Sequence, residues 1–385
     1  MTSRERLFAA LRHRQPDRVP FDLGSTQVTT ISVAAYEALR DHLGLAPRQV
    51  TVCDTIQQAA LPDDDLLDLW DVDTRGLFPL TSANWHIEHR EAGDHWLATD
   101  EWGLRYTFPK HGGHYYSLVE SPLAEGTLSR QAIEAHRWPQ PRRHERIAAL
   151  RQRAEAAREE GKVVVLKGFC AGLVEMGERL RGMEPFLCDL MLDPQGATRL
   201  MRKVLDLKLA FWELALDELG DVADVVLEAD DFGTQESLLV PPRVFRSLVR
   251  PLLAELMAFL RQKLGTGKFI LFHSCGSVRD LIPDFIDMGI DALNPVHVAA
   301  AGMEPAALKR DFGRHIAFWG GGVDTQGVLP TATPQQVRDD VRRNVEALAP
   351  DGGYVFTTVH NVQPDVPPQN LVAMWEALQE FGAYY

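Results

Sequence analysis

From about residue 161 to its end, the chain alternates short runs rich in β-branched and aromatic residues with longer amphipathic runs. Such alternation is typical of βαβ units, in which successive strands lie parallel and helices cover the sheet. We expect strands at 163–168, 225–229, 268–273, 291–296, 315–319 and 353–358. We expect helices at 194–219, 242–264, 278–288, 305–312, 334–348 and 368–381. The sequence therefore predicts an α/β protein with a mainly parallel sheet.

An early Pro-bounded run at 19–23 supplies a seventh strand, and the eighth would lie at 50–56 or at 76–80. Eight strands close a (β/α)8 TIM barrel, and a barrel of this kind holds a chain of 385 residues as one domain, 1–385. An open doubly wound sheet is the second possibility. No G-x-G-x-x-G follows an early strand, which weakens a dinucleotide-binding interpretation.

Residues 85–118 break the strand–helix alternation. Three runs, 85–89, 95–99 and 104–108, alternate apolar and polar residues, and turn residues separate them. This pattern predicts an antiparallel β-meander inserted early in the barrel. Its Trp and Tyr residues would suit a lid over a pocket or a contact between subunits. The simpler alternative is an insertion that packs against the barrel and has no catalytic role.

Charge and cysteine usage narrow the class of protein. The formal net charge is −14, which argues against nucleic acid and anionic membrane surfaces as partners. The four cysteines are far apart and form no C-x-x-C, as in reduced proteins. Thr2 and Glu5 fit a capping box at the start of a helical run. The N-terminal residues lack the apolar stretch of a secretory signal sequence. We expect a cytoplasmic protein with no membrane span.

The run Phe272-His273-Ser274-Cys275-Gly276 closes one predicted strand with a histidine and a cysteine two residues apart. Alternate residues of a strand share a face, so both side chains can point into one site. Imidazole and thiolate are zinc ligands, and a catalytic zinc needs three protein ligands. His360, after the last predicted strand, can supply the third. His297 can be a fourth ligand or a substrate contact, and a structural role for it is equally expected.

Paired acids follow the strand at 225–229. Asp230 and Asp231 can bind substrate, orient a zinc ligand or act as a base, and a helix cap is the structural alternative. We take them as candidate catalytic residues. Asp22, after the first strand, and Asp324, after three glycines, are weaker candidates of the same kind, and Lys167 and Glu175 flank the same rim.

Several motifs together resemble the uroporphyrinogen decarboxylase superfamily, within it the zinc-dependent methylcobamide:thiol methyltransferases. They lie at 168–169, 178–186, 192–194, 230–235, 273–276, 320–325 and 365–370. The resemblance implies a (β/α)8 barrel with zinc at its C-terminal mouth, held by His273 and Cys275, and a homodimer. With the motifs placed, Asp22, Gln235, His297 and Asp324 are our candidate substrate-binding residues.

The superfamily pattern has a second cysteine where this chain has His360. One thiolate and two neutral imidazoles leave a zinc site with a net charge near +1, which binds a thiolate more tightly and makes it a poorer nucleophile. The implied function is methyl or alkyl transfer to a thiol or related acceptor, and activation of water is the variant that this charge favours. The chain has no D-x-H-x-x-G corrinoid signature, so cobalamin would come from a separate corrinoid partner protein.

Two other functions stay open at this point. Uroporphyrinogen decarboxylase has an early Arg-rich segment that binds substrate carboxylates, and this chain has Phe21-Asp22-Leu23-Gly24-Ser25-Thr26 there. The missing arginines argue against uroporphyrinogen decarboxylase itself. The alternative function is a decarboxylase or lyase without metal, in which Asp residues and His360 handle protons, and a ligand-binding barrel without enzyme activity is the third hypothesis.

Overall fold

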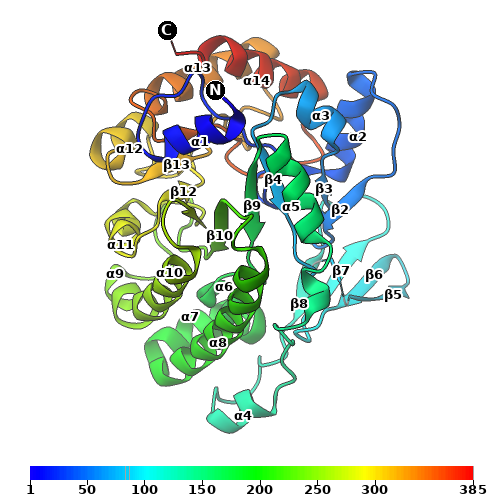
Figure 1. The fold of residues 1–385 in the computed structure, drawn as a ribbon. Helices are drawn as coiled ribbons and strands as arrows, with labels where there is room; N and C mark the ends of the chain where they lie inside the picture. The colour runs from blue at the N-terminus through cyan, green and yellow to red at the C-terminus, as the bar shows by residue number, and fades with distance from the viewer. Residues whose placement is uncertain (83, 86, 385) are drawn as a thin grey trace.

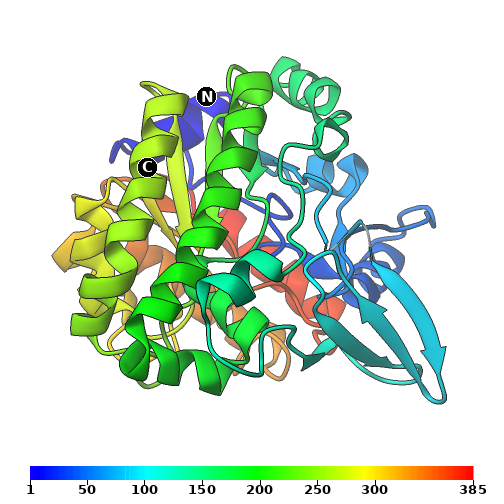
Figure 2. The same cartoon turned by 90° about the horizontal axis from the view of Figure 1, so that it is seen from below.

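Parallel strands form the curled sheet that the alternating pattern predicts. The computed structural model describes residues 1–82, 84–85 and 87–384. In this part of the chain the sheet has the order β14-β13-β12-β11-β10-β9-β4, with all neighbours parallel. Helices surround the sheet, as Figures 1 and 2 show. The strands are β4 Thr74–Leu77, β9 Val163–Lys167, β10 Val225–Ala229, β11 Phe269–His273, β12 Ala292–Asn294, β13 Ala317–Trp319 and β14 Tyr354–Val355.

The segment 19–23 lies between the two edges of this sheet. Phe21 forms a parallel bridge with Phe356, and on its other side its carbonyl accepts the N–H of Asp73 at 2.9 Å. Pro20 has no N–H to donate, so the segment makes too few ladder bonds to count as a strand. The prediction of a TIM-barrel-like fold is confirmed, and 76–80 was the better choice for the eighth strand, since β4 overlaps it.

The helices begin largely where the sequence predicts. In the described part of the chain five helices, α8, α9, α12, α13 and α14, start at a proline, where its missing N–H costs no helical hydrogen bond. The run 242–264 differs, because a π-helical turn precedes Pro251, a residue that cannot donate in the helix. The elements are α1 Ser3–Leu11, α2 Val33–His42, α3 Asp64–Leu69, α4 Arg130–Ala135, η1 His144–Arg146, α5 Leu150–Glu159, α6 Leu173–Arg181, α7 Met183–Leu192, α8 Pro194–Leu219, α9 Pro242–Val244, η2 Phe245–Val249, α10 Arg250–Leu264, η3 Arg279–Leu281, α11 Ile282–Asp287, α12 Pro305–Phe312, α13 Pro334–Leu348 and α14 Pro368–Phe381.

Two apolar clusters divide the core. Inside the barrel, Val163 and Val165 of β9 pack with the inward residues of the neighbouring strands, and Leu7 and Phe8 of α1 join this cluster. Residues that alternate with them, such as Val164 and Leu166, face the helices in the larger cluster. Alternate residues of a strand face the same side, so the residue two positions after Val165, at the C-terminal end of β9, also faces the inside of the barrel.

Two antiparallel sheets complete the early part of the chain. The predicted meander exists and protrudes from the barrel (Figure 2), but it has a fourth strand, and its first strand starts later than expected. Part of the expected first strand, at His86, lies outside the described residues. The strands are β5 Glu88–Ala92, β6 His95–Thr99, β7 Arg105–Pro109 and β8 Ser117–Glu120 in one sheet, and β1 Ile31–Ser32, β2 Thr51–Asp54 and β3 Ala59–Leu61 in the other.

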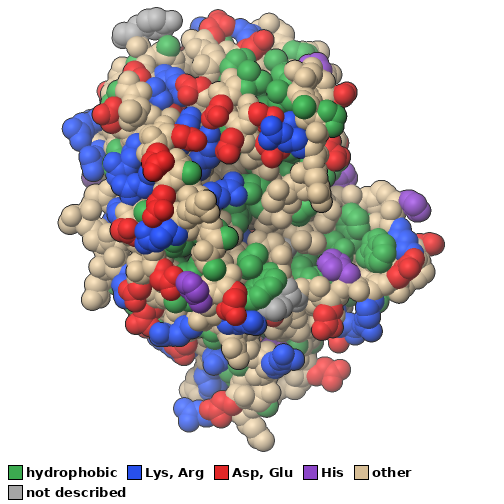
Figure 3. Space-filling model, turned by 45° about the vertical axis from the view of Figure 1, so that its right-hand side comes forward, with side chains coloured by type: hydrophobic (Ala, Val, Ile, Leu, Met, Phe, Trp, Pro, Cys, Tyr) green, Lys and Arg blue, Asp and Glu red, His purple; other side chains and the backbone are tan. Residues whose placement is uncertain are grey.

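The surface carries both signs of charge without one dominant patch on the face that Figure 3 shows. Apolar side chains appear on the protruding meander, where Trp96 is 38% and Val119 is 57% exposed. Across the described residues, none of the helices combines the length and apolar character that a membrane crossing requires.

Candidate metal centre and its cavity

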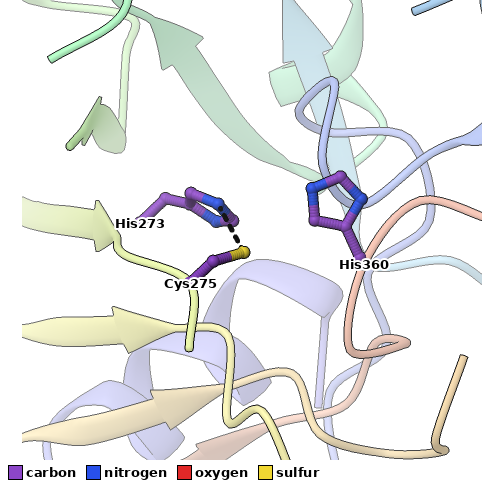
Figure 4. A group of neighbouring side chains, drawn as sticks. All are labelled: His273, Cys275 and His360. Atoms are coloured by element: carbon purple, nitrogen blue, oxygen red, sulfur yellow. Dashed lines mark hydrogen bonds between the residues drawn. The ribbon is translucent and has the colours of Figure 1, made fainter. Parts of the chain in front are cut away.

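His273 and Cys275 lie together at the C-terminal end of β11. The imidazole Nε2 of His273 is 3.3 Å from the Sγ of Cys275 (Figure 4). The backbone N–H of Cys275 donates to Asp231 Oδ1 at 2.8 Å, and that of Ser274 donates to the carbonyl of Asn294 at 2.7 Å. These backbone bonds hold the residues after β11 against the ends of β10 and β12.

His360 comes to the same place from the segment after β14. Its ring centroid is 5.8 Å from that of His273 (Figure 4). One ligand atom from each of His273, Cys275 and His360 lies within 4.8 Å of the other two. Ligand atoms around a tetrahedral zinc are about 3.3–3.6 Å apart, given Zn–N and Zn–S bonds of about 2.1 and 2.3 Å. The three side chains need to close by about 1 Å to fit zinc.

Each histidine is oriented by an asparagine. His273 Nδ1 is 2.5 Å from Asn294 Oδ1, and the amide of Asn294 donates from Nδ2 to the carbonyl of Trp319 at 2.7 Å. Since Nδ2 is occupied by that carbonyl, Oδ1 is the acceptor and Nδ1 of His273 carries the proton. The tautomer therefore leaves the Nε2 lone pair free for a metal.

The same arrangement recurs at His360. Its Nδ1 is 2.5 Å from Asn361 Oδ1, which also accepts from Gln363 Nε2 at 2.8 Å. The Nδ2 of Asn361 donates to Gln57 Oε1 at 3.2 Å. Both imidazoles are thus held by amide oxygens, with their Nε2 atoms available, which is the second layer of contacts that zinc-binding histidines usually have.

The titration of the two half-buried ligands also fits a metal. Burial lowers the pKa of His360 to about 4, and His273 adds to the shift, so the imidazole is neutral at pH 7. Burial raises the pKa of the Cys275 thiol well above its ordinary value, with contributions from Asp231 and Glu175. A divalent cation would reverse the preference at the thiol, because it stabilises the thiolate. The donor set of two imidazoles and one thiol suits zinc.

Beside these ligands lies a cavity of about 970 Å³, open solvent at its mouth included. His273, His360 and Asp231 form part of its wall, and Asp231 Oδ1 is 3.6 Å from His273 Nε2. Strand ends and α6 form another part. The meander contributes Asp100, Trp102, Leu104 and Tyr106. The meander is thus part of the site, as a wall of the cavity.

Comparison with known proteins identifies the family. The model of the uroporphyrinogen decarboxylase (URO-D) family matches residues 112–381, which is more than half of the chain. The chain belongs to the uroporphyrinogen decarboxylase family.

Relatives within this family match only segments of the chain. The uroporphyrinogen decarboxylase of Acidiphilium cryptum is 29% identical over 157 residues, 41% of this chain and 40% of that protein. That of Methylococcus capsulatus is 31% identical over 96 residues, a quarter of each. A methyltransferase from Methanosarcina mazei has the same fold over the full length of both chains, with a TM-score of 0.65 and 17% identity.

Asp22, in the segment where the decarboxylase has its arginines, is closed off from the cavity. It is fully buried, and its two oxygens accept four hydrogen bonds. The donors are Ser25 N, Ser25 Oγ, Thr74 Oγ1 and Trp319 Nε1. This carboxylate ties segment 19–23 to β4 and β13, and no lone pair is left for a substrate. The structure does not bring Asp22 to the site.

Asp230 and Asp231 follow the end of β10, and their carboxylates lie in different surroundings. Asp231 faces the cavity. Asp230 is fully buried on the outer side, where it accepts the N–H groups of Val174 and Glu175, both at 3.0 Å. These are first-turn amides of α6, so Asp230 caps that helix from another strand. Its carboxylate holds the turn between β9 and α6 and does not line the cavity.

The other predicted substrate contacts are dispersed. Gln235 bonds Gln326 through Nε2 at 2.6 Å and does not line the cavity. Asp324 lies in a separate hollow beside Asp340. His297 is 8% exposed, and both of its ring nitrogens lack a hydrogen-bond partner among the described residues. It also contributes to the lowered pKa of His360, which places it near the ligands. The substrate role of these three residues stays a prediction.

Sequence reasoning missed residues that come from outside the strand ends. Asp54, Asp100, Tyr106 and Arg179 line the cavity. For Asp54, Asp100 and Tyr106 the only signal was the aromatic, polar character of the meander and of the segment before it, whereas Arg179 lies on α6 within the motif at 178–186. The two orienting asparagines were also missed, although Asn294 ends β12, the neighbour of the strand that ends at His273, and Asn361 directly follows His360.

Proposed function

We propose that this chain is a zinc-dependent transferase that moves a methyl or other small alkyl group to a thiol or related acceptor. The observation that carries the proposal is the convergence of His273, Cys275 and His360, with ligand atoms within 4.8 Å, at the C-terminal ends of barrel strands. In this fold, catalytic residues gather at that end. The shared fold of a protein named as a methyltransferase supports the same class of reaction.

The roles of the side chains follow from their contacts. His273 and His360 would hold zinc through Nε2, and Cys275 would hold it as a thiolate. Zinc bound there would act as a Lewis acid that lowers the pKa of an incoming thiol. Asp231, whose Oδ1 lies 3.6 Å from His273 Nε2, is placed to accept the thiol proton. Trp102 and Tyr106 of the meander also line the cavity, and their aromatic rings would limit the access of water.

The alkyl donor would be supplied by a partner. A corrinoid carried by a separate protein suits the proposed reaction, because this chain has no corrinoid-binding motif of its own. The acceptor nucleophile depends on the charge of the site. One thiolate ligand in place of two leaves the centre more positive, and this favours tight thiolate binding at some cost in nucleophilicity.

Zinc analysis tests this function. Purified protein should contain about one zinc per chain, and Cys275→Ser should lose it. The matched control is Cys188→Ser, since Cys188 is an exposed cysteine on α7. Zinc-loaded protein should also demethylate methylcobalamin in the presence of a thiol, which the cobalamin absorption spectrum reports. A protein without stoichiometric zinc, purified without chelators, would refute the proposal.

A decarboxylase without metal is the second candidate, and the names of the curated relatives favour it. A porphyrinogen carries eight carboxylates, and the segment at 21–26 offers no arginine to bind them. Asp22, Ser25 and Thr26 in that segment are fully buried. Turnover of uroporphyrinogen III by the purified protein would favour the decarboxylase over the transferase.

A further inference from the structure

The turn between β9 and α6 forms one wall of the cavity, to which residues 168–171 all contribute. This turn lies directly against β10. The N–H of Gly168 donates to the carbonyl of Leu227 at 3.1 Å, and a Cβ on Gly168 would lie 3.1 Å from Glu228 Oε1. The shape of the wall therefore depends on the groups that stand behind the turn, outside the barrel.

A buried ion pair stands there. Lys208 of α8 donates from Nζ to Glu228 Oε2 of β10 at 2.7 Å, and both side chains are buried. Trp212, about one helical turn further along α8, donates from Nε1 to the other carboxylate oxygen, Oε1. The ammonium group of Lys208 also donates to the backbone carbonyl of Cys170 at 3.1 Å. One cation thus joins a helix, a strand and the wall of the cavity.

Other groups hold the turn on either side of Cys170. The ring of Phe169 stacks on that of Phe211, which is also on α8, with centroids 5.5 Å apart. Asp230 of the segment after β10 caps the first turn of α6. Lys208 supplies the contact between these two points, at the middle of the turn. The wall is thus fixed at three places by α8 and by residues at the end of β10.

Net stability is a weak reason for a buried ion pair. Both charges lose hydration when they are buried, and apolar residues of similar volume often give equal or greater stability. Removal of one partner alone is costly, because the other charge then stays buried without a partner. Apolar residues cannot, however, donate a hydrogen bond to the carbonyl of Cys170. The contact that Lys208 adds is therefore one of geometry.

We infer that Lys208 is a positioning residue, which fixes the cavity wall at 168–171 through the carbonyl of Cys170. Glu228 holds the ammonium group in place, and Trp212 holds the carboxylate. Without the bond from Lys208, the turn is free to move away from α8, and the side chain of Cys170 becomes more accessible. This role of Lys208 rests on the proposed function only for what the cavity binds.

The reactivity of Cys170 tests the role of Lys208. In the double variant Lys208→Met/Glu228→Gln, neither charge is left buried alone, and the new amide oxygen can still accept from Trp212. Alkylation by iodoacetamide, followed by peptide mass spectrometry, measures the rate at each cysteine separately. Cys170 should react about tenfold faster than in the unaltered protein, the ratio that corresponds to the loss of one hydrogen bond from a charged donor.

Two other cysteines of the chain are internal controls. Cys53 is 4% exposed, so its alkylation reports unfolding of the protein. Cys188 is exposed, so its alkylation reports the activity of the reagent. Neither rate should differ between the double variant and the unaltered protein, and thermal melting shows that both proteins are folded.

The matched control variant is Arg40→Met/Asp65→Asn. Arg40 is also a buried cation that pairs with a carboxylate, that of Asp65 at 2.8 Å, and donates to a backbone carbonyl, that of Ala46 at 2.7 Å. It does not line the cavity. This variant should leave the alkylation rate of Cys170 unchanged.

An unchanged rate at Cys170 in the folded double variant would overturn the positioning role. A rise at Cys170 that is equalled at Cys53, or in the Arg40 variant, would also overturn it, because the rate would then follow general stability. In the demethylation assay of the proposed function, the double variant should raise the KM for the thiol and keep the zinc content, since the three ligands lie on other segments.

Alkylation of Cys170 requires neither zinc nor turnover, so it separates this role from the proposed function. A protein without stoichiometric zinc in which Cys170 still responds to the double variant would refute the transferase and keep the positioning role. Zinc-dependent thiol alkylation in a protein whose Cys170 does not respond would do the reverse.

Discussion

Replacing Asn294 with alanine is expected to weaken zinc binding without touching a metal ligand. Asn294 is 1% exposed and bridges His273 Nδ1, at 2.5 Å, to the carbonyl of Trp319, at 2.7 Å. Without this amide, the proton of His273 is free to move to Nε2, and the ring is free to turn. Either change removes the lone pair that faces Cys275.

The size of the effect follows from the contacts that are lost. Loss of an outer partner of a metal-binding histidine typically weakens metal affinity by about 10- to 100-fold, or about 1.4–2.7 kcal/mol. The protein should also lose about 1–3 kcal/mol of folding stability, since the carbonyl of Trp319 and the imidazole are left buried without a partner. The two effects have to be separated.

Asn370→Ala is the matched control. Asn370 is also 1% exposed and donates two hydrogen bonds at 2.9 Å, to the carbonyls of Leu329 and Ala332. Its removal should lower stability by a similar amount, about 1–3 kcal/mol, and leave zinc affinity unchanged. Competition with a chromogenic chelator measures the zinc Kd of each variant, and the Co(II) absorption spectrum reports the ligand geometry.

Two patterns of results would refute the role of Asn294 in orienting His273. If Asn294→Ala and Asn370→Ala lower the Tm alike, and the zinc Kd of Asn294→Ala stays within about twofold of the unaltered value, then Asn294 has no role in orienting His273. A weaker zinc Kd in both variants would also count against it, because the effect would then follow stability rather than orientation.

The remaining predictions concern the ligands, their titration and the wall of the cavity. His360→Ala should weaken zinc binding but retain some, because His273 and Cys275 are held independently at β11; zinc affinity unchanged by this substitution would show that His360 is not a ligand. In the metal-free protein, burial lowers the pKa of His360 to about 4 against about 6.5 when unfolded, so His360 contributes stability above pH 6.5 that is lost as the pH falls toward 4. Urea unfolding should therefore show a smaller loss of stability between pH 7 and pH 5 in His360→Gln, and equal losses in both proteins would contradict the assignment. Gly172→Ala should destabilise the protein by about 1–3 kcal/mol, because a Cβ there would lie 2.0 Å from Asp230 Cγ although its φ of −64° suits alanine; an unchanged Tm would mean that Asp230 does not need to stay on the first turn of α6.

The repeating pattern in the sequence was enough for the architecture. The strand at 225–229 and the helices at 194–219, 305–312, 334–348 and 368–381 have the predicted bounds. Apolar periodicity and a proline in the first helical turn are local signals. They predicted these bounds because each element follows the conformational preferences of its own residues. That the side chains of His273 and Cys275 face one side is also a local property, because residues two apart in an extended segment share a face.

Closure of the barrel and the walls of the site were decided by contacts distant in sequence. Whether 50–56 or 76–80 joined the barrel depended on which partner edge each segment met, and neither segment carries that information itself. Asp22 and Asp230 look like site residues at strand ends, yet one is saturated by four donors and the other caps α6. The strand pattern does not say how many donors surround a carboxylate.

The sequence by itself predicted the type of barrel, the strand end that carries His273 and Cys275, and the place of His360 after the last strand. Only the tertiary structure decided that His360 reaches them, that Asn294 and Asn361 orient both imidazoles, and that the meander forms a wall of the cavity. Periodicity acts between near neighbours in the chain. A metal centre and a cavity are built from segments up to some 300 residues apart, as in the bond between Asn361 and Gln57, whose separation is 304 residues.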